Sequence, residues 1–595
     1  MQNNFIETTP SSKMSWCSDI ILIFVVGCVI YMALGFMRPL ASPDEGRYSE
    51  IPREMVAHGD YVTPRLNDMP YFYKPPFFYW MQAASIKTFG INRFSLRFPN
   101  ALMAVFGICA TYAAARALSG RAAGVFSAGI LATSILYLAL GQIITLDTTV
   151  SVFISSALFA FIVGIKKSGL WRHALIAAFF VLCALAVLTK GLIGIVIPAA
   201  IIFLYAICTG PVDFFKKFGR GDWIWILIGI ALFSIISVPW HILASLDNPA
   251  YDNAGGIFSK EWEGQGFFWY YIIHEHFLRY IDVDTSMREQ PWWFFIVLSL
   301  VGFIPWVLLL PRALKDTFGD CGRRMLNAPK EAVFFCIWIV FVVFFFSLSK
   351  SKLAPYILPI FPALSVLTGA WFAKCWKDKF ARSIKIEQIL FVVLGYLVSV
   401  APIPIYFVLS SKGKIYDHSY ALFVCISLSV IMLILTTATL YIMLVKKNVK
   451  AFMAMVFVVS CVFSMYFNPM AILFQRSDTE PLAKYLKANR KTGEDVAILR
   501  DYNHFHDLPV WLGETVYLFD VPPLEQRFGF MREKQKHAHR FFPTAEQQSE
   551  FIKSRKAALW VLCRASDAEI LKKLSPAAEE IMRNGDILLF RIERK

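Results

Sequence analysis

The sequence predicts a mainly α-helical protein that crosses a membrane many times and ends in a small α/β domain. Of its 595 residues, 57% are hydrophobic and only 17% are charged, whereas about 25% of residues are charged in an average soluble protein. Long apolar runs recur up to residue 470 and then stop. With 54 Phe and 16 Trp, the composition excludes a disordered chain as well as a single soluble core.

A transmembrane helix needs about 20 mostly apolar residues. Thirteen runs are candidates, at 19–38, 97–118, 121–141, 145–165, 171–190, 192–208, 223–244, 291–311, 332–349, 354–376, 386–409, 420–445 and 449–470. The first is longer than the apolar part of a signal peptide, and Arg38 interrupts the approach to a cleavage site, so we expect an uncleaved helix. We therefore assign 1–470 to a membrane domain with large outer loops at 39–96 and 245–290.

Basic residues concentrate in alternate turns between these runs. They lie at 116–121, 166–172, 216–220, 312–330, 374–385 and 446–450. Because Lys and Arg favour the cytoplasmic side, this pattern predicts a cytoplasmic N-terminus and, after thirteen crossings, a C-terminus on the outer side. It also accounts for the net charge of +16 without a nucleic-acid partner.

After the last apolar run, charged residues become frequent, and 471–595 is expected to form a small α/β domain on the outer side. Its expected strands are Val496–Leu499, Val516–Phe519, Leu559–Leu562 and Ile587–Ile592, and its expected helices include Ala545–Arg555 and Asp567–Leu574. Cys563 is its one cysteine, so no disulfide can form within it.

Charged residues gather in the first outer loop, where the first helix leaves the membrane. Asp44, Glu45 and Arg47 can together hold a phosphate, a metal ion or a proton, or form a structural ion-pair cluster. A short interfacial helix is expected over Ser49–Gly59. Further on, Pro75 and Pro76 fix the approach of Lys74 among aromatic residues, which suits a lipid-linked phosphate or an interfacial lysine that reaches water.

Other charges occur at membrane depth or in the later outer loops. Asp147 and Lys190 have no counter-ion nearby in sequence, so each is expected to pair with another segment. His274 and His276 are two residues apart and do not face together on a helix, which leaves one histidine with a first-loop carboxylate as a metal site. Arg279, Lys350, Lys352 and Tyr356 complete the set. Lysines and arginines on the outer side contradict the preference of these residues for the cytoplasmic side. Binding of an anionic phosphate is the simplest reason to retain them there.

Taken in order, these motifs resemble the polyprenyl-phosphate-dependent glycosyltransferases of the GT-C fold, and among them the lipid A aminoarabinose transferases, which are related to protein O-mannosyltransferases. The resemblance covers the whole chain. It rests on Asp44–Tyr48 with Ile51–Met55, Lys74–Pro76, Leu146-Asp147, Leu188–Gly191, His276 with Arg279, and Ser351–Pro359.

The resemblance implies a multi-pass enzyme of the bacterial inner membrane, linked to polymyxin resistance, with its C-terminal domain in the periplasm. It implies transfer of aminoarabinose or a related amino sugar from undecaprenyl phosphate to a lipid A phosphate. Its carboxylates would be Asp44, Glu45 and Asp147, and its donor site would contain Arg47, Lys74, Lys190, Arg279, Lys352 and Tyr356.

One departure from the family concerns the metal. In the aminoarabinose transferases a glutamate typically precedes Lys-Pro-Pro and is implicated in metal binding with the loop histidine. Here that position is Tyr73, which leaves His276 without the expected partner. Zinc is therefore a candidate cofactor with one of its expected ligands missing.

Three alternative functions have some support in the sequence. A protein O-glycosyltransferase or a transferase for another envelope glycan fits the same motifs. A transporter or flippase is disfavoured because the charges cluster at one face and no internal repeat is visible. A sensing module on a membrane anchor does not need thirteen spans.

Overall fold

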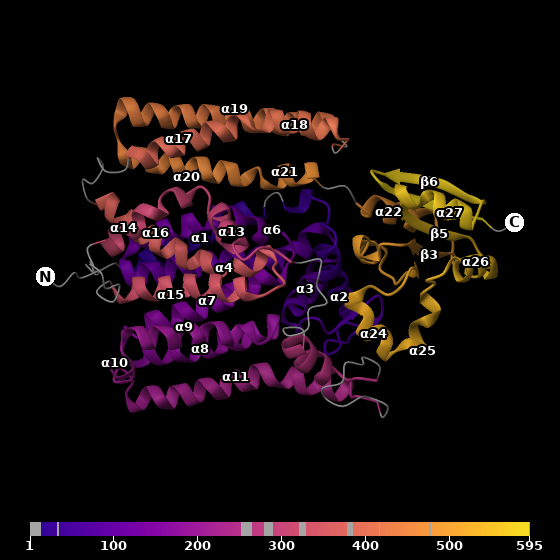
Figure 1. Ribbon diagram of the computed structural model, residues 1–595, viewed down its shortest axis with the longest axis horizontal. Coiled ribbons are helices and arrows are strands. Elements are labelled where there is room, and N and C mark those ends of the chain that lie inside the picture. The colour runs from indigo at the N-terminus through magenta and orange to yellow at the C-terminus, as the bar shows by residue number, and fades with distance from the viewer. Residues whose placement is uncertain are drawn as a thin grey trace.

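The computed structural model describes residues 13–32, 35–251, 264–278, 289–319, 329–377, 385–413, 415, 417–474 and 478–593. It contains a bundle of long helices with their axes roughly aligned, and an α/β domain at one end of that bundle (Figure 1). A helical part and a small C-terminal α/β domain, both expected from the sequence, are present in the fold.

Within the described ranges, nine helices are long and apolar enough to cross a membrane. They are α1 (Lys13–Met32), α4 (Arg93–Ser119), α7 (Leu146–Gly164), α8 (Gly169–Lys190), α11 (Arg220–Asp247), α15 (Lys330–Leu348), α17 with α18 (Lys385–Val400 and Pro402–Ser411), α19 (His418–Tyr441) and α20 with α21 (Val449–Met465 and Phe467–Phe474). Two shorter apolar helices are α9 (Ile193–Thr209) and α16 (Ile360–Lys377). Their positions coincide with eleven of the predicted runs, and the chain is a multi-pass membrane protein.

The two remaining runs form bent helix pairs instead of straight spans. In one, α5 (Arg121–Ala132) and α6 (Ile135–Gln142) meet at 64°, and in the other, α13 (Phe294–Gly302) and the segment Trp306–Phe318, which contains α14 (Leu310–Phe318), meet at 105°. The bends contact each other: Trp306 Nε1 donates to Thr133 Oγ1 at 2.9 Å, and the Ile135 N–H donates to the Ile304 carbonyl at 3.4 Å. These bonds satisfy polar groups at the breaks, as a low-dielectric interior requires. The total of thirteen crossings stays a prediction.

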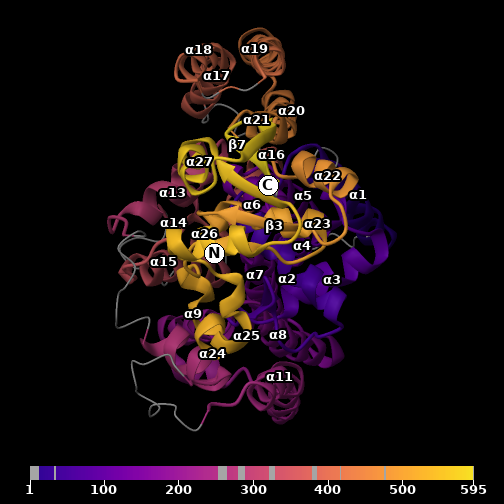
Figure 2. The same ribbon diagram turned by 90° about the vertical axis from the view of Figure 1, so that its right-hand side faces the viewer.

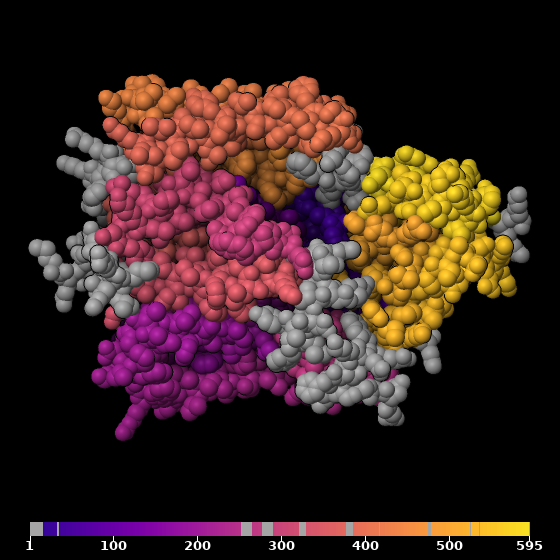
Figure 3. All heavy atoms as spheres, in the orientation of Figure 1, coloured from indigo at the N-terminus to yellow at the C-terminus, as the bar shows by residue number. Residues whose placement is uncertain are grey.

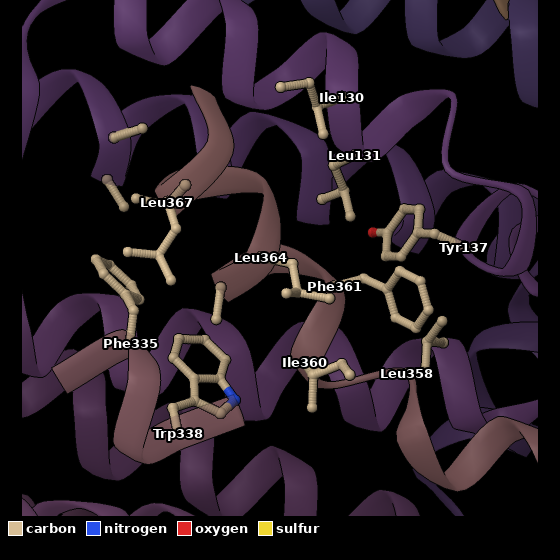
Figure 4. Close-up of a cluster of buried hydrophobic side chains, with 14 of the residues drawn as sticks. Ile130, Leu131, Tyr137, Phe335, Trp338, Leu358, Ile360, Phe361, Leu364 and Leu367 are labelled. Atoms are coloured by element: carbon tan, nitrogen blue, oxygen red, sulfur yellow. The ribbon is translucent and has the colours of Figure 1, made fainter. Parts of the chain in front are cut away.

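The centre of the bundle is a packed apolar core. Between α5, α15 and α16, Phe361 and Leu364 lie close to Leu131 and Trp338 (Figure 4), and the Trp338 side chain has 0% exposure. Helices α17, α18 and α19 lie at one edge of the bundle in both views (Figures 1 and 2), and α17 reaches the core through Val392. The core therefore fixes the helices that carry the outer loops.

The first outer loop folds into short elements that lie against the end of the bundle. They are α2 (Asp44–His58), the paired strands β1 (Arg65–Leu66) and β2 (Met69–Pro70), and α3 (Phe77–Phe89). Lys74 lies in the non-helical stretch before α3, as its two prolines predict. The predicted interfacial helix exists, but it begins at Asp44 instead of Ser49.

The C-terminal domain contains a five-stranded sheet with helices around it. Its helices are α22 (Glu480–Asn489), α23 (Asp507–Leu512), α24 (Arg527–Arg532), α25 (Lys534–His537), α26 (Ala545–Ser554) and α27 (Ala568–Leu574). Its strands are β3 (Asp495–Leu499), β4 (Tyr517–Phe519), β5 (Leu559–Arg564), β6 (Ala578–Asn584) and β7 (Ile587–Ile592), in the order β4-β3-β5-β7-β6. Strands β4, β3 and β5 run parallel, and β7 is antiparallel to both neighbours. The four predicted strands are confirmed, and β6 was missed because its sequence is rich in charge and lies at an edge.

The C-terminal domain lies next to α2 of the first outer loop, at the end of the helical bundle (Figure 1). Asn67 exchanges two hydrogen bonds with the backbone of Val516, at 3.1 and 3.0 Å. Gly46 of α2 packs on α23 so closely that an added Cβ would lie 2.6 Å from the backbone nitrogen of Asp507. The loop therefore lies between the membrane helices and the C-terminal domain, and this position defines the site.

Candidate functional site

A cavity of about 850 Å³ lies where the outer loops, the ends of the helices and the C-terminal domain meet. On the face shown in Figure 3, the surface is hollowed between the helices and the C-terminal domain, and indigo atoms from early in the chain lie at its floor. The cavity lining includes seven predicted site residues, Asp44, Arg47, Lys74, Asp147, Lys190, His276 and Tyr356. The fold thus brings together groups that are far apart in sequence.

Asp147 and Lys190 form an ion pair in this cavity. Asp147 lies in the first turn of α7, and Lys190 is the last residue of α8. Their side chains are only 13% and 10% exposed. Thr145 Oγ1 also donates to Asp147 Oδ2 at 2.9 Å, and the Lys190 ammonium lies 4.6 Å from the centre of the Tyr356 ring. The expectation that each charge finds its partner in another segment is confirmed.

Lys74 lines the same cavity from the first outer loop. Its ammonium lies 4.4 Å from the centre of the Tyr73 ring, within the range of a cation–π contact. The Tyr73 ring is in turn 6.1 Å from that of Tyr71. Tyr73, which stands where the family has glutamate, therefore supports a cation here and supplies no carboxylate.

Asp44 and Arg47 lie one turn apart at the start of α2 and form an ion pair. Arg47 also pairs with Glu525, a cavity residue from the C-terminal domain. The Tyr71 hydroxyl donates to Glu525 Oε2 at 3.5 Å. Glu525 was not predicted, because no sequence pattern places a short segment of the C-terminal domain against the first loop.

Glu45 is placed differently from its neighbour Asp44. Its side chain has 0% exposure and accepts hydrogen bonds from Arg38 at 2.9 Å and from Arg97 at 2.7 and 3.0 Å. Burial opposes its ionisation, but the two guanidiniums outweigh burial and lower the pKa of Glu45 to about 2. Glu45 therefore fixes the loop to the membrane helices, and the described cavity lining does not include it.

Of the predicted donor-binding residues, Lys352 does not belong to the described cavity lining. The Lys352 ammonium donates to the Ser349 carbonyl at 2.6 Å, and its neighbour Lys350 lines the cavity instead. Arg279 lies outside the described residues. The basic residues Lys74, Lys190, Lys350 and Arg47 therefore form the cationic part of the site.

His276 is held in one orientation by backbone groups. Its Nδ1 lies 2.6 Å from the Tyr271 carbonyl, and its Nε2 accepts from the Leu192 N–H at 3.4 Å. Burial, with a smaller contribution from Lys74, lowers the pKa of His276 and favours the neutral ring. Gly191 makes this packing possible, because an added Cβ would lie 2.4 Å from Nε2.

These residues do not fit the zinc site that the resemblance left open. Both ring nitrogens of His276 face backbone partners, and the adjacent loop offers Tyr73 where a carboxylate is needed. In the part of the chain that the structure describes, no group of three His, Cys, Asp or Glu side chains has the geometry to hold a metal ion.

The chain is similar in sequence to glycosyltransferases that use sugars linked to polyprenyl phosphates. A family model described as dolichyl-phosphate-mannose-protein mannosyltransferase matches residues 73–240. The undecaprenyl phosphate-α-4-amino-4-deoxy-L-arabinose arabinosyl transferase 1 of Proteus mirabilis is 31% identical over 415 residues, which are 69% of this chain and 69% of that protein. The corresponding enzyme of Aeromonas salmonicida is 30% identical over 367 residues, 60% of this chain. The chain spans only 61% of the length of the Aeromonas protein and 64% of its Pectobacterium carotovorum counterpart.

Solved structures extend the likeness over nearly the whole chain. The crystal structure of ArnT from Cupriavidus metallidurans bound to undecaprenyl phosphate aligns with a TM-score of 0.78 and 23% identity, covering 98% of both chains. Its apo form gives 0.77 and 24%, again covering 98% of both chains. The predicted GT-C type fold is thereby confirmed. The chain belongs to the family of undecaprenyl phosphate-α-4-amino-4-deoxy-L-arabinose arabinosyl transferases.

Proposed function

We propose that the protein transfers 4-amino-4-deoxy-L-arabinose from undecaprenyl phosphate to a phosphate group of lipid A. Family membership supports the reaction class. The observation that carries the proposal is the cavity itself, where Lys74, Lys190 and Arg47 converge with carboxylates between the membrane helices and the outer domain. Such a site suits a substrate whose sugar and phosphate lie outside the bilayer while its tail stays within it.

The proposed chemistry breaks the bond between the anomeric carbon and the oxygen of the lipid phosphate, while an oxygen of the acceptor phosphate forms the new bond to that carbon. Negative charge then grows on the departing phosphate while the sugar gains oxocarbenium character. Lys74, Lys190 and Arg47 would stabilise this phosphate, because fixed charges aimed at developing charge lower the barrier. The lysines sit on aromatic rings and Arg47 lies between two carboxylates, so their positions are fixed before substrate binds.

The acceptor decides the role of Asp44. An acceptor phosphate is already ionised at neutral pH and needs no base, so Asp44 would orient it or stabilise the sugar cation. A hydroxyl acceptor would need a base, and Asp44 would serve. The match of 73–240 to a protein mannosyltransferase model is the observation that favours this second candidate, a protein O-glycosyltransferase. Full activity in Asp44→Asn would exclude a hydroxyl acceptor with Asp44 as the base.

We also propose that the enzyme lies in the bacterial inner membrane with its N-terminus in the cytoplasm and its C-terminal domain in the periplasm. Basic residues in alternate turns support this orientation. The cavity then opens on the periplasmic side, where a lipid A acceptor would meet an undecaprenyl-linked donor.

Mass spectrometry of lipid A tests the proposal. Cells with the gene should carry aminoarabinose on lipid A, and cells without it or with Lys74→Ala should not. Lys87→Ala is the matched control, because Lys87 also contacts a tyrosine ring, at 4.9 Å, but lies on α3 outside the described cavity lining. An unchanged lipid A profile on deleting the gene would reject the acceptor, and wild-type modification by Lys74→Ala would reject the donor-site role of Lys74.

A further inference from the structure

One hydroxyl group in the cavity lining is buried and lacks a protein partner. Tyr271 lies in the second outer loop, on the π-helix Trp269–Leu278. It lines the cavity at 2% exposure, and its hydroxyl oxygen has no hydrogen-bond partner among the described residues. A buried hydroxyl without a partner is costly, so such a group in a substrate cavity indicates that a ligand completes it.

Position distinguishes this hydroxyl from others of the same kind. Tyr61, Tyr79 and Tyr502 also have buried hydroxyls without a partner in the described ranges, but they do not belong to the described cavity lining. Of these four tyrosines, only Tyr271 is placed to meet a substrate. The other three offer controls in which the hydroxyl is isolated away from the cavity.

Aromatic packing holds the Tyr271 ring in place. The ring stacks on Phe267, with ring centres 5.3 Å apart and planes at 11°, and Trp240 meets it edge-on at 6.1 Å. The hydroxyl lies against Gly191, where an added Cβ would be 2.8 Å from the hydroxyl oxygen. The position of the hydroxyl is therefore fixed before a substrate binds, and the ring packing does not depend on the hydroxyl.

The hydroxyl lies at the start of a long helix. Gly191 follows Lys190, the last residue of α8, and α9 begins two residues later at Ile193. The first N–H groups of a helix have no partner within it, and they carry the positive end of the helix dipole, which favours an anion. The Tyr271 hydroxyl and the first turn of α9 thus offer hydrogen-bond donors at one position, beside the Lys190 ammonium.

The cavity lining becomes apolar along the same helix. Leu192, Ile193 and Val196 line the cavity beyond Gly191, and Leu192 and Val196 are 38% and 43% exposed. A lipid tail that runs along these side chains would place the phosphate of the lipid at the start of α9. The Tyr271 hydroxyl then lies where the polar and apolar parts of such a ligand meet.

The hydroxyl keeps its proton and is able to donate it in a hydrogen bond. Burial, with a smaller contribution from Glu275, raises the pKa of Tyr271 well above its usual value. His276 Nε2, which also lies against Gly191, already accepts from the Leu192 N–H. A hydrogen bond from the hydroxyl to a phosphate oxygen is charge-assisted, and so is stronger than one to a neutral group.

We propose that the Tyr271 hydroxyl donates a hydrogen bond to the phosphate of the polyprenyl-linked donor and positions that phosphate at the start of α9. This inference rests on the proposed function, and it adds a neutral group to the lysines that bind the phosphate there. A neutral donor fixes the direction of a phosphate oxygen without changing the balance between the lysines and the carboxylates of the cavity.

The test uses Tyr271→Phe in the full-length protein, because this change removes only the hydroxyl oxygen. Native mass spectrometry of the protein in detergent measures the Kd of two lipids, undecaprenyl phosphate and undecaprenol, which lacks the phosphate. Tyr271→Phe should raise the Kd of undecaprenyl phosphate about 10- to 100-fold, the range for losing a hydrogen bond to a charged group, and leave the Kd of undecaprenol unchanged. The kcat/KM for the sugar donor should fall by a similar factor.

Tyr79→Phe is the matched control. Tyr79 has 0% exposure and a buried hydroxyl without a described partner, but it lies on α3, outside the described cavity lining. This variant should leave the Kd of both lipids unchanged. Equal losses of undecaprenyl phosphate binding in Tyr79→Phe and Tyr271→Phe would show an effect unrelated to the cavity and refute the inference.

The outcomes separate this inference from the proposed function. If wild type transfers no aminoarabinose to lipid A, the proposed function fails, whereas the Kd of the two sugar-free lipids still tests Tyr271. If Tyr271→Phe weakens undecaprenyl phosphate and undecaprenol equally, the residue acts through packing and the inference is refuted. If the Kd of undecaprenyl phosphate is unchanged and only the sugar-carrying donor binds more weakly, the hydroxyl contacts the sugar and its assignment to the phosphate is wrong.

Discussion

The ion pair between Asp147 and Lys190 allows a structural role to be separated from a catalytic one. We consider Lys190→Met, Asp147→Asn and the double variant. Lys190→Met leaves Asp147 charged at 13% exposure. Breaking a buried ion pair by removing one partner costs about 3–5 kcal/mol, and the partial exposure in a polar cavity reduces this to about 2–3 kcal/mol. Thermal unfolding of the purified protein should show this loss as a lower Tm.

The double variant separates the effect on stability from the effect on activity. With both charges removed, neither residue leaves an unpaired charge, so most of the lost Tm should return. If Lys190 stabilises the departing phosphate, activity should not return, because kcat/KM still lacks a fixed cation, typically a loss of about 100- to 1,000-fold. Transfer to lipid A measured beside Tm gives both numbers. A double variant with near-wild-type Tm and near-wild-type kcat/KM would show that the pair is structural only.

Two further predictions concern the packing around His276 and the pH dependence of protein stability. Gly191→Ala should displace the His276 ring and lower transfer at least about tenfold, because the added Cβ would lie 2.4 Å from His276 Nε2 at a backbone φ of +85°. Gly210→Ala is the control for backbone strain. Gly210 has a φ of +90°, but its added Cβ would have no atom nearer than 3.7 Å, so this variant should spare transfer. Burial raises the pKa of Asp507 to about 7 from 3.8. Between these two pH values the native state keeps a proton that the unfolded state releases. The stability of the folded protein therefore falls as pH rises through this window. Asp507→Asn should flatten the fall of Tm with pH. An unchanged slope of Tm against pH would show that Asp507 is not the group responsible.

Much of the helical architecture was predictable because a bilayer imposes a simple requirement of length and apolarity. The bends were not predictable in the same way. The break after Ala132 falls at Thr133-Ser134, without Gly or Pro, and its polar partner is Trp306 on a segment far along the chain. Local sequence shows neither the bend nor the contact that satisfies it.

The candidate site shows the same limit at two adjacent residues. Asp44 and Glu45 read as one acidic motif, but α2 begins at Asp44, so successive side chains point about 100° apart. Asp44 faces the cavity, while Glu45 faces Arg38 and Arg97 in the interior. A helix start at Ser49, as the sequence predicts, leaves this motif in a loop, where neither side chain has a defined direction.

Helix α2 explains why the C-terminal domain belongs to the site and is not an appendage. On the membrane side, Glu45 holds the helix to Arg97. On the outer side, Arg53 donates to Glu50 at 2.6 Å and to the Gly513 carbonyl of the C-terminal domain at 3.0 Å. Burial and the neighbouring Glu50 carboxylate raise the pKa of Glu54, which favours its protonated form. The Arg53 guanidinium then neutralises the Glu50 carboxylate, and the proton neutralises Glu54.

With both of its faces held by buried charges, α2 presents Asp44 and Arg47 to the cavity in a fixed orientation, and Glu525 meets Arg47 from the opposite wall. Positioning within about 0.5 Å is what a preorganised catalytic site requires. Loosening the C-terminal domain would therefore move Arg47 and Glu525 together, and the site would lose a cation that the proposed function gives to the phosphate.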